Sequence, residues 1–458
     1  MPSAPVSDVQ ERAQPAPTSA FDAHGPRADV AERSRAGDRR GTFTSARLTL
    51  GRGLVGMWIM PQTRRVLSLY EGFFAGGARI LHTDVVTSLH QRGQQHSVLS
   101  LTDEARREGT VQRAEDDLRY QQLVASGVSI TALDRTAGAE APSAFTADEL
   151  RTAAAAVAGA DLILTLKEQP LALLLELQRA RLMPEIPVIA CLHRSDPEHS
   201  GPALEWLRDA TSTGLVTGVI ACAQSTKDAY VDAGVIARTS AVIPNGIDTT
   251  RFQPPSARTR RRRRAAIGIR GGGPVILLAA RFDAMKDPEL FLRAASAHMA
   301  ANRVSNYVLC GAGMTWDNPA FAELADRVGI ADRSRVHALG IRDDMPAIYQ
   351  AADIVALTSA FGEASPLCLI EGIASGAIPV TTDVGDAARE VAGVGLVTGP
   401  DPAGVAAAWD QAWEERRARR QAAIAARTRV DRRRMIDDYE RFAGVVASQT
   451  APVLVPQG

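Results

Sequence analysis

The chain has 458 residues, of which 45% are hydrophobic and 23% are charged, a composition that is ordinary for a soluble globular protein. This length exceeds what one hydrophobic core usually supports, and it predicts two domains with terminal tails. Lysine plus arginine and aspartate plus glutamate both number 52, so the formal net charge is zero, which argues against a generally basic nucleic-acid-binding protein.

The N-terminal segment differs in composition from the rest of the chain. Residues 1–42 are rich in Ala, Pro, Ser, Asp and Arg and almost lack large apolar residues, so we expect them to be disordered. The apolar stretch LTLGRGLVGMWIM, at 48–60, is shorter than the roughly 18 to 20 residues of a membrane span and contains Arg52. We interpret it as packed chain or loop and expect a cytoplasmic protein, while a peripheral association with the membrane stays open.

Between the tails, short apolar runs alternate with stretches of helical pattern. Runs of this length, about 15 to 30 residues apart, indicate parallel strands in βαβ units and therefore two doubly wound, Rossmann-like α/β domains. We place the domains at 65–240 and 241–430, followed by a segment at 431–458 that could return to the first domain and that ends in a loose tail, SQTAPVLVPQG. The predicted strands are RVLSLY, HSVLSL, DLILTL, PVIAC and GVIAC in the first domain and PVILLAA, NYVLC, DIVALTS and IPVTT in the second.

Ligands of such sheets bind beyond the carboxyl ends of the strands, so the loops there hold the candidate site residues. Gly76 and Gly77 follow the first strand, where adjacent glycines either let the backbone approach an anion or form a tight turn. The Gly-x-Gly-x-x-Gly dinucleotide fingerprint is absent, which disfavours a nicotinamide enzyme. A later strand leads to His193, Asp196 and His199; His193 could bind an acceptor, orient a substrate hydroxyl or face solvent.

Two cations follow the first strand of the second domain. Arg281 and Lys286 are five residues apart at a strand end, where both can face one anion, the arginine through a fork of two donors and the lysine as a point charge. Earlier in the chain, Arg258 and Arg260–Arg264 form a basic run. A nucleic-acid site is one reading of this run, but the solvated start of a helix ahead of the second domain's first strand is favoured.

Glycines also follow later strands of the second domain. Gly311 and Gly313 form a Gly-Ala-Gly turn that admits a flat or phosphorylated ligand, although a plain turn would have the same sequence. Gly340, Ile341 and Arg342 lie in another loop between a strand and a helix, where backbone groups could contact a nucleobase edge.

The stretch FGEASPLCLIEG contains two carboxylates on either side of an apolar run. Ser365 suits an N-cap and Pro366 the first helical position, so we expect a buried helix over 366–375. Glu371 then lies inside a buried element and needs a partner, since an unpaired buried carboxylate costs several kcal/mol. Glu363 lies in the loop before the helix, near its positive N-terminal end. The pair could be an acid and base, two groups that hold a sugar, or surface charges.

The cysteines and potential metal ligands show no site spacing. Cys191, Cys222, Cys310 and Cys368 are far apart, each in or beside an apolar run, and no Cys-x-x-Cys or Cys/His pattern occurs. We therefore expect buried free thiols, no disulfides and no zinc site.

Taken together, the second-domain segments resemble a known family. VIPNGIDTTRFQP, AARFDAMKDPELFLRA, LCGAGM and the run from LGIRDDMPA to VGDAARE occur in the order found in family 4 retaining glycosyltransferases of the GT-B fold. The resemblance covers about 65–420 and is densest in the second half. It implies that two Rossmann-like domains face a central cleft, the first choosing the acceptor and the second binding a nucleotide sugar.

The resemblance also implies roles for individual residues. Arg281 and Lys286 would hold the diphosphate and stabilise it as leaving group, Glu363 would bind donor-sugar hydroxyls, and Glu371 would bind the ribose hydroxyls. His193 matches the acceptor-side histidine, and these assignments make Arg281, Lys286, Glu363 and His193 the catalytic candidates. The other donor-binding candidates are Gly76, Gly77, Gly311, Arg342, Ala364, Ser365, Pro366 and Leu367. One segment departs from the family, because VGDAARE, with Asp386 and Glu390, replaces the usual Gly-Gly-x-Pro-Glu turn.

The function implied is a retaining transfer of sugar from a nucleoside diphosphate sugar, such as a UDP- or GDP-sugar, to an acceptor hydroxyl. No Asp-x-Asp metal ligand set is evident, so we expect a metal-independent enzyme without a cofactor. A sugar-nucleotide epimerase or hydrolase on the same fold is the alternative, and a glycosidase using both glutamates or a non-catalytic sugar-nucleotide binder is less favoured. The acceptor could be a small molecule or lipid-linked, and the oligomeric state is left open.

Overall fold

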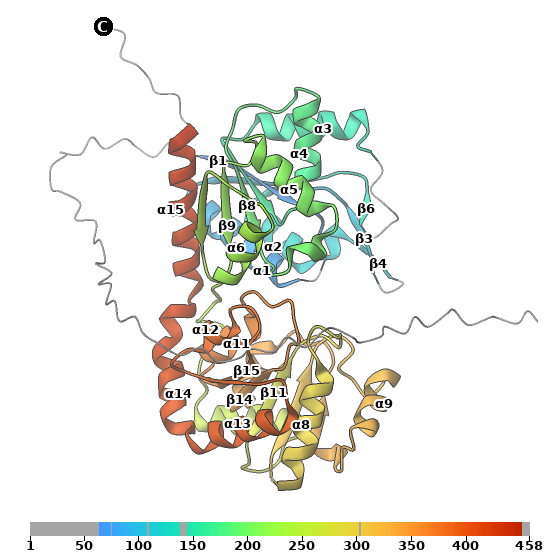
Figure 1. Cartoon of the computed structure of the whole chain (residues 1–458), viewed down its shortest axis with the longest axis vertical. Coiled ribbons are helices and arrows are strands. Elements are labelled where there is room, and N and C mark those ends of the chain that lie inside the picture. Colours follow the sequence, from blue (N-terminus) through green and yellow to red (C-terminus); the bar gives the residue numbers. More distant parts are fainter. Residues whose placement is uncertain (1–63, 75, 108–109, 138–143, 302–303, 451–458) are drawn as a thin grey trace, which may run out of the picture. The chain divides into compact units, whose positions relative to one another are not determined.

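The computed structural model describes residues 64–74, 76–107, 110–137, 144–301 and 304–450 (Figure 1). All of them fall within one unit of the chain, residues 60–458. The expectations for residues 1–42 and for the apolar stretch at 48–60 lie outside the described residues.

The first half of the chain builds a parallel sheet with the strand order β10-β9-β8-β7-β1-β2-β5. Successive side chains of its strands pack into two different apolar clusters, one on each face of the sheet. Leu67 and Ile163 belong to one cluster, and Val66 and Leu164 belong to the other. Because both faces are covered, the central strands are continuous apolar runs. The strands are β1 (Arg65–Tyr70), β2 (Gln95–Ser100), β5 (Ser129–Ala132), β7 (Leu162–Leu166), β8 (Val188–Leu192), β9 (Gly218–Ala221) and β10 (Thr239–Val242).

Helices connect these strands, and a small second sheet lies beside them. The helices are α1 (Gly77–Gln91), α2 (Leu118–Ala125), α3 (Ala147–Ala158), α4 (Leu171–Arg179), α5 (Ala203–Ser212) and α6 (Gln224–Asp232), with 3-10 turns η1 (Ala114–Asp116) and η2 (Pro197–Ser200). The small sheet has the order β4-β3-β6 and contains β3 (Glu104–Arg107), β4 (Thr110–Arg113) and β6 (Thr136–Ala137).

The second half repeats the architecture with the strand order β13-β12-β11-β14-β15-β16, again all parallel. The strands are β11 (Val275–Ala279), β12 (Asn306–Cys310), β13 (Val336–Ala338), β14 (Ile354–Leu357), β15 (Ile378–Thr382) and β16 (Leu396–Thr398). The helices are α7 (Ala257–Ala266), α8 (Pro288–Ala301), α9 (Pro319–Arg327), α10 (Met345–Ala351), α11 (Leu367–Ala374), α12 (Ala387–Val391), α13 (Pro402–Glu414) and α14 (Arg416–Ala425), with η3 (Arg333–Arg335) and η4 (Ala426–Val430).

Each main sheet has a point where the strand order reverses. In the first sheet the chain moves outward from β1 through β2 to β5 and then restarts on the other side at β7. In the second it moves from β11 to β13 and restarts at β14. Loops at the carboxyl ends of strands that flank such a reversal diverge and leave room for a ligand. The fold therefore favours binding sites after β1 and β7 and after β11 and β14.

The last helix, α15 (Arg432–Thr450), packs into the core of the first half. Its Tyr439 and Phe442 share an apolar cluster with Val66 and Leu164 of the first sheet. Figure 1 shows this helix running alongside β9 at the side of the first half. The chain thus ends, within the described residues, on the half from which it began.

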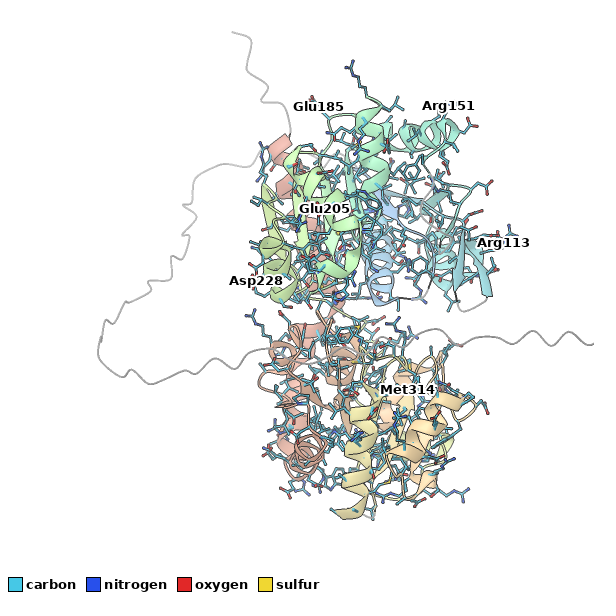
Figure 2. All side chains as sticks on the ribbon, turned by 45° about the vertical axis from the view of Figure 1, so that its right-hand side comes forward. Arg113, Arg151, Glu185, Glu205, Asp228 and Met314 are labelled. Atoms are coloured by element: carbon cyan, nitrogen blue, oxygen red, sulfur yellow. The ribbon has the colours of Figure 1, made fainter. Side chains whose placement is uncertain are left out.

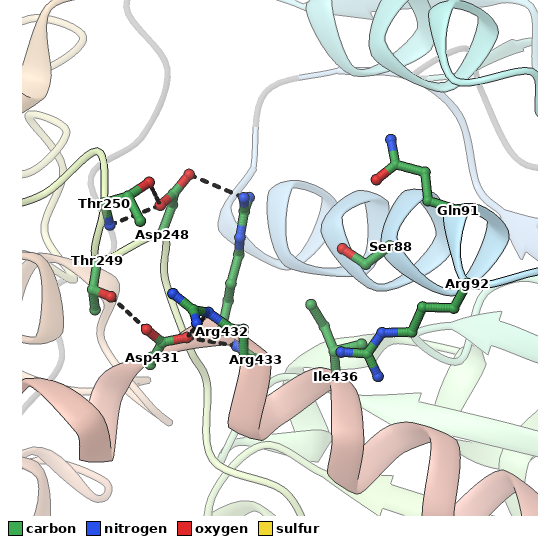
Figure 3. Close-up of a pocket in the computed structure, with 10 residues that line it drawn as sticks. All are labelled: Ser88, Gln91, Arg92, Asp248, Thr249, Thr250, Asp431, Arg432, Arg433 and Ile436. Carbon is green, nitrogen blue, oxygen red and sulfur yellow. Dashed lines mark hydrogen bonds and ion pairs between the residues drawn. The ribbon is translucent and has the colours of Figure 1, made fainter.

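Charged residues hold the start of α15 in place. Arg432 bridges Asp84 of α1 at 3.5 Å. It also pairs with Asp248 at 3.0 Å, and the Thr249 hydroxyl donates a hydrogen bond to Asp431 (Figure 3). The surrounding cavity of about 330 Å³ contains acids and bases that pair with one another, so its charges already have partners. We interpret it as the packing of a crossing point between the two halves.

Charged side chains lie outside and sulfur lies inside, as expected for a water-exposed α/β protein. In Figure 2, Arg151, Glu185, Glu205 and Asp228 mark exposed positions of the first half, whereas Met314 is fully buried within the second. The four cysteines are free, as expected, and burial raises the pKa of each thiol to about 12. They are therefore uncharged packing groups at neutral pH.

The strands predicted from sequence all form, within one or two residues of their expected limits. Strands β5, β10 and β16 were not predicted, and each lies at the edge of its sheet, where short and partly exposed strands lack an apolar run. The expectation of loose chain from Ser448 is wrong for its first residues. Helix α15 continues to Thr450, and the Gln449 side chain accepts a hydrogen bond from the Thr239 hydroxyl at 2.8 Å.

Candidate active site

A cavity of about 660 Å³ is lined by loops from both main sheets. Gly76 and Gly77 follow β1, and Lys167 follows β7 directly. Arg281 follows β11, and Glu363 lies in the loop after β14. These are the loops at the reversal points of both sheets, so the cavity occupies the position in which doubly wound sheets bind ligands.

Most of the sequence-predicted site residues line this cavity, and three do not. Gly311, Arg342 and Glu371 are absent from its lining. The predicted residues that line it are Gly76, Gly77, His193, Arg281, Lys286, Glu363, Ala364, Ser365, Pro366 and Leu367.

Two helix starts meet at the cavity. Helix α1 begins at Gly77 and α11 at Leu367, and a Cβ atom added to Gly77 would lie only 3.0 Å from the Leu367 side chain. The small residue therefore allows the two helix starts to approach closely. Since helix N-termini carry unpaired N–H groups and partial positive charge, their convergence favours an anionic ligand.

Lys286 and Glu363 form the central ion pair of the cavity. The Lys286 Nζ atom lies 2.5 Å from Glu363 Oε1, and the side chains are 18% and 5% exposed. The same carboxylate oxygen accepts a hydrogen bond from the Ser359 hydroxyl at 2.5 Å. A buried carboxylate requires such partners, and the lysine remains accessible enough to contact a second anion.

Arg281 is the more exposed of the two cations. Its side chain is 62% exposed, and its guanidinium pairs with Asp283 of its own loop at 2.9 Å. An exposed pair of this kind contributes little to stability, so the guanidinium can exchange its partner for a ligand at small cost. The expected pair of cations after β11 is thus present at the cavity.

The loop from Glu363 to Leu367 is held by side chains from several elements. The Asn245 amide donates a hydrogen bond to the Ser365 carbonyl at 2.9 Å, and the Ser195 hydroxyl donates to the Glu363 carbonyl. The Ser365 hydroxyl donates to Glu390 at 2.7 Å. This network fixes the loop that begins α11.

Ser365 is therefore not the N-cap that its sequence position suggests. The N-cap residue of α11 is Pro366, and no side chain caps this end. The Ser365 hydroxyl instead contacts Glu390, a residue of the segment that departs from the family pattern. This leaves first-turn N–H groups of α11 without a side-chain acceptor, at the edge of the cavity.

His193 enters the cavity from the first half as a neutral ring. Burial, and then the neighbouring positive charge of Lys167, lower the pKa of His193 to about 3. Its Nε2 atom is buried and has no hydrogen-bond partner among the described residues. A neutral imidazole with an unused nitrogen is suited to bind a hydroxyl group of a ligand.

The sequence analysis missed polar residues that follow β7. Lys167 adopts a left-handed backbone conformation (φ 68°), burial lowers its pKa, and it lines the cavity. Glu168, 1% exposed, accepts hydrogen bonds from the Ser200 hydroxyl at 2.9 Å and from the Tyr230 hydroxyl. Their position in the sequence could have indicated a role in the site, because both come immediately after the strand DLILTL, where a ligand-binding loop is expected.

Arg79 is a further cavity residue that the sequence did not single out. It lies in the first turn of α1 and is 4% exposed. Its guanidinium stacks 3.8 Å from the centre of the Phe74 ring and donates to the Phe74 carbonyl. The cavity thus collects positive charge from both halves of the chain.

Comparison with known proteins assigns a family to each half. Residues 75–251 match the family described as glycosyltransferase family 4, and residues 273–415 match glycosyl transferases group 1. Both halves of the chain therefore match models of glycosyltransferase families.

Curated relatives of this chain include a D-inositol 3-phosphate glycosyltransferase of Salinispora arenicola (strain CNS-205), 35% identical over 176 residues. That match covers 35% of this chain and 39% of the relative. The D-inositol 3-phosphate glycosyltransferase of Nocardia farcinica (strain IFM 10152) is 32% identical over 149 residues, which is 31% of this chain and 32% of the relative. The matched region therefore spans well under half of these relatives.

Solved structures share the fold at low sequence identity. Anabaena Alr3699/HepE, solved in complex with UDP-glucose, matches with a TM-score of 0.66 and 20% identity over 84% of this chain and 100% of that one. Sucrose-phosphate synthase from Thermosynechococcus elongatus matches with a TM-score of 0.61 and 17% identity, covering 84% and 100%. The fold is GT-B, as the sequence predicted.

The other two expected loop residues, Gly311 and Arg342, lie near the same sheet edge but outside the cavity lining. Gly311 has φ 145°, and a Cβ atom there would lie 2.1 Å from the Ala280 carbonyl oxygen, so close backbone packing already explains this glycine. Arg342 pairs with Asp344 through two contacts of 2.8 and 2.9 Å. Their donor-binding roles stay predictions.

Glu371 is inside the second half, on α11, and is partly buried. Burial raises its pKa to about 7, opposed by the neighbouring Tyr349 hydroxyl and by the charge of Arg251. The carboxyl is therefore close to half ionised at neutral pH. Its proposed contact with ribose also stays a prediction.

In the part of the chain that the structure describes, no three His, Cys, Asp or Glu side chains gather as a metal site. None of the helices described there is both long and apolar enough to cross a bilayer.

Proposed function

We propose that this glycosyltransferase moves a sugar from a nucleoside diphosphate sugar to an acceptor hydroxyl, with retention at the anomeric carbon and without a metal. One observation carries the proposal: Arg281, Lys286 and the start of α11 surround one cavity with Glu363. Two cations and a helix N-terminus suit a diphosphate, while a carboxylate suits sugar hydroxyls.

In the proposed reaction the acceptor oxygen forms a bond to the anomeric carbon as the bond from that carbon to the diphosphate oxygen breaks. The electron pair of the breaking bond goes to the diphosphate, and the acceptor proton passes to a phosphate oxygen on the same face. Arg281 and Lys286 lower the barrier because they are fixed positive charges where negative charge develops. Glu363 holds the sugar and at the same time keeps Lys286 in position.

His193 is proposed to orient a hydroxyl of the sugar or acceptor. Its lowered pKa keeps the ring neutral at any pH above about 4, so it can donate or accept a single hydrogen bond without carrying charge. The Lys167 ammonium forms no hydrogen bond or ion pair with another described residue, and it adds a positive charge on this side. An acceptor with a phosphate group fits this arrangement, and the Salinispora relative is named for such an acceptor.

A UDP-sugar is the first donor to test, because the Anabaena neighbour was solved with UDP-glucose. Thermal shifts with UDP-, GDP-, ADP- and TDP-sugars would identify the nucleotide, and incubation with inositol 3-phosphate and other polyols would be followed by mass spectrometry. We expect a glycoside product with the donor's anomeric configuration by NMR. Free sugar alone would favour a hydrolase, an epimerised nucleotide sugar would favour an epimerase, and an inverted product would refute retention.

A further inference from the structure

The basic run of α7 is only partly solvated, contrary to its interpretation from sequence. Helix α7 forms as expected, but Arg264 is 8% exposed and the Arg260 side chain 14% exposed. Both turn inward to Asp353, because residues four apart lie on one face of a helix. There they line a cavity of about 500 Å³ together with residues of α13 and α14.

This cavity lies far from the cavity of about 660 Å³ lined by Lys286 and Glu363, which we call the donor pocket. Asp353 immediately precedes β14, and Gly376 and Ile378 lie at the start of β15, so the cavity is at the amino edge of the second sheet. The donor pocket lies at the carboxyl edge of the same sheet. A strand of five residues separates the two edges by about 16 Å. A ligand in one cavity therefore does not reach the other.

Positive charge exceeds negative charge in the lining. Asp353 is the one carboxylate among the lining residues, all of which the structure describes, and it already pairs with two guanidinium groups. A surplus of four positive charges remains in a chain whose formal net charge is zero. The lining arginines are Arg260, Arg264, Arg416, Arg417 and Arg420.

Several of these guanidinium groups have N–H donors that no anion accepts. The Arg260 Nη2 atom is buried and has no hydrogen-bond partner among the described residues. The exposed Arg417 guanidinium forms no hydrogen bond or ion pair within that same part of the chain. Arg416 donates only to the Trp413 carbonyl at 2.7 Å, and Arg420 only to the Pro255 carbonyl at 3.3 Å. Burial lowers the pKa of Arg420, as expected for a cation without a nearby anion.

We propose that this cavity is a separate binding site for a small polyanion that carries two or more phosphate groups. Arginine forks bind phosphate oxygens through paired hydrogen bonds, and a surplus of four charges matches such a ligand. The volume lies within the roughly 300 to 1,000 Å³ of small-molecule sites. The Trp413 ring, with the Arg416 guanidinium 4.4 Å from its centre, forms one wall. The ligand is either a free polyphosphorylated compound or a phosphorylated lipid headgroup.

Binding should be measured with inorganic tripolyphosphate by calorimetry. Because the donor pocket also attracts phosphate, the full chain should carry Arg281→Ala and Lys286→Ala throughout. We expect this background variant to bind tripolyphosphate at one site, and the further change Arg417→Ser with Arg420→Ser to weaken binding about tenfold or more. Trp413 emission should change on binding, and that change should be absent in Trp413→Phe.

A matched control changes two exposed arginines outside this cavity, Arg151→Ser in α3 with Arg441→Ser in α15, in the same background. It removes equal charge and should leave the affinity within about twofold. Equal weakening by both pairs would reduce the effect to net charge and overturn the proposal. Flotation with phosphatidylcholine vesicles, with and without cardiolipin, whose headgroup carries two phosphates, separates the two ligand sources. Vesicle binding that depends on Arg417 and Arg420 without tripolyphosphate binding would identify a headgroup, and absence of both would overturn the proposal.

Discussion

Asp386 of the second half accepts a backbone hydrogen bond from Gln224, at the start of α6 in the first half, at 2.8 Å. Its other carboxylate oxygen accepts from the Ser225 N–H at 2.9 Å. The Asp386 N–H in turn donates to the Ala364 carbonyl at 3.0 Å. The segment that departs from the family pattern therefore links the loop of Glu363 to a helix of the other half.

Asp386→Asn should weaken this link while preserving side-chain volume. The amide keeps one acceptor oxygen but loses the negative charge at a helix N-terminus, so we expect the free energy of unfolding to fall by about 1 kcal/mol. Because the donor loop shares the contact, kcat/KM for the donor should fall several-fold. Urea unfolding and initial rates measure the two effects.

The matched control is Asp401→Asn, since Asp401 caps α13 within the second half by accepting from Gly404 at 2.6 Å. It should cost similar stability and leave kcat/KM unchanged. Equal activity losses in both variants would attribute the effect to stability and refute the link.

Lys286→Ala should remove sugar transfer while the protein still folds. The change deletes a cation expected to face the leaving diphosphate. It leaves the buried Glu363 carboxylate with the Ser359 hydroxyl as its remaining side-chain partner among the described residues. We expect a loss of stability of about 3 kcal/mol, as for one partner removed from a buried pair. Circular dichroism would check folding, and nucleoside diphosphate release would measure turnover.

Lys227→Ala, a partly exposed lysine on α6, serves as the matched control and should behave like the unmodified enzyme. A folded Lys286→Ala variant with unchanged turnover would exclude the proposed role in stabilising the leaving group.

The sequence predicted the central strands and the loops after them because buried parallel strands are continuous apolar runs. It placed Gly76, Arg281 and Glu363 in those loops, and all three line one cavity. Edge strands such as β5 were not predicted because partly exposed strands lack a continuous apolar run.

The contacts between distant segments could not be predicted. Ser365 has the sequence position of an N-cap, yet its hydroxyl binds Glu390, 25 residues away. From sequence alone, Arg260 and Arg264 belong to a basic run that should be solvated. In the folded chain both pair with Asp353, which immediately precedes β14. Local propensity describes what a residue does in isolation, and these residues respond to partners that only tertiary packing supplies.

Removing divalent metal should leave activity largely intact. Fixed cations, Arg281 and Lys286, are expected to neutralise the diphosphate in place of an ion. Initial rates with and without EDTA, in metal-free buffer, would measure this. Complete loss of activity that added Mg²⁺ or Mn²⁺ restores would overturn the metal-free proposal.

Glu371→Gln should have opposite effects on stability and on nucleotide binding. Burial raises the pKa of Glu371 from 4.5 to about 7, so the folded protein binds this proton more tightly than the unfolded chain. The resulting stability is fully present below about pH 4.5 and is lost as pH rises through 7, a change of about 3 kcal/mol. Glutamine never ionises, so the variant should exceed the unmodified protein in stability at pH 8 and match it near pH 5. Urea unfolding at both pH values measures this.

The same substitution should weaken nucleotide binding more than acceptor binding, because the carboxylate is expected to accept hydrogen bonds from both ribose hydroxyls. An amide retains one acceptor oxygen, so a loss of about tenfold in nucleotide affinity is expected by calorimetry at pH 8. The stability change tests only burial of the carboxyl, whereas the affinity change tests the ribose contact. A more stable variant with unchanged nucleotide affinity would therefore keep the buried carboxyl and refute its role in donor binding.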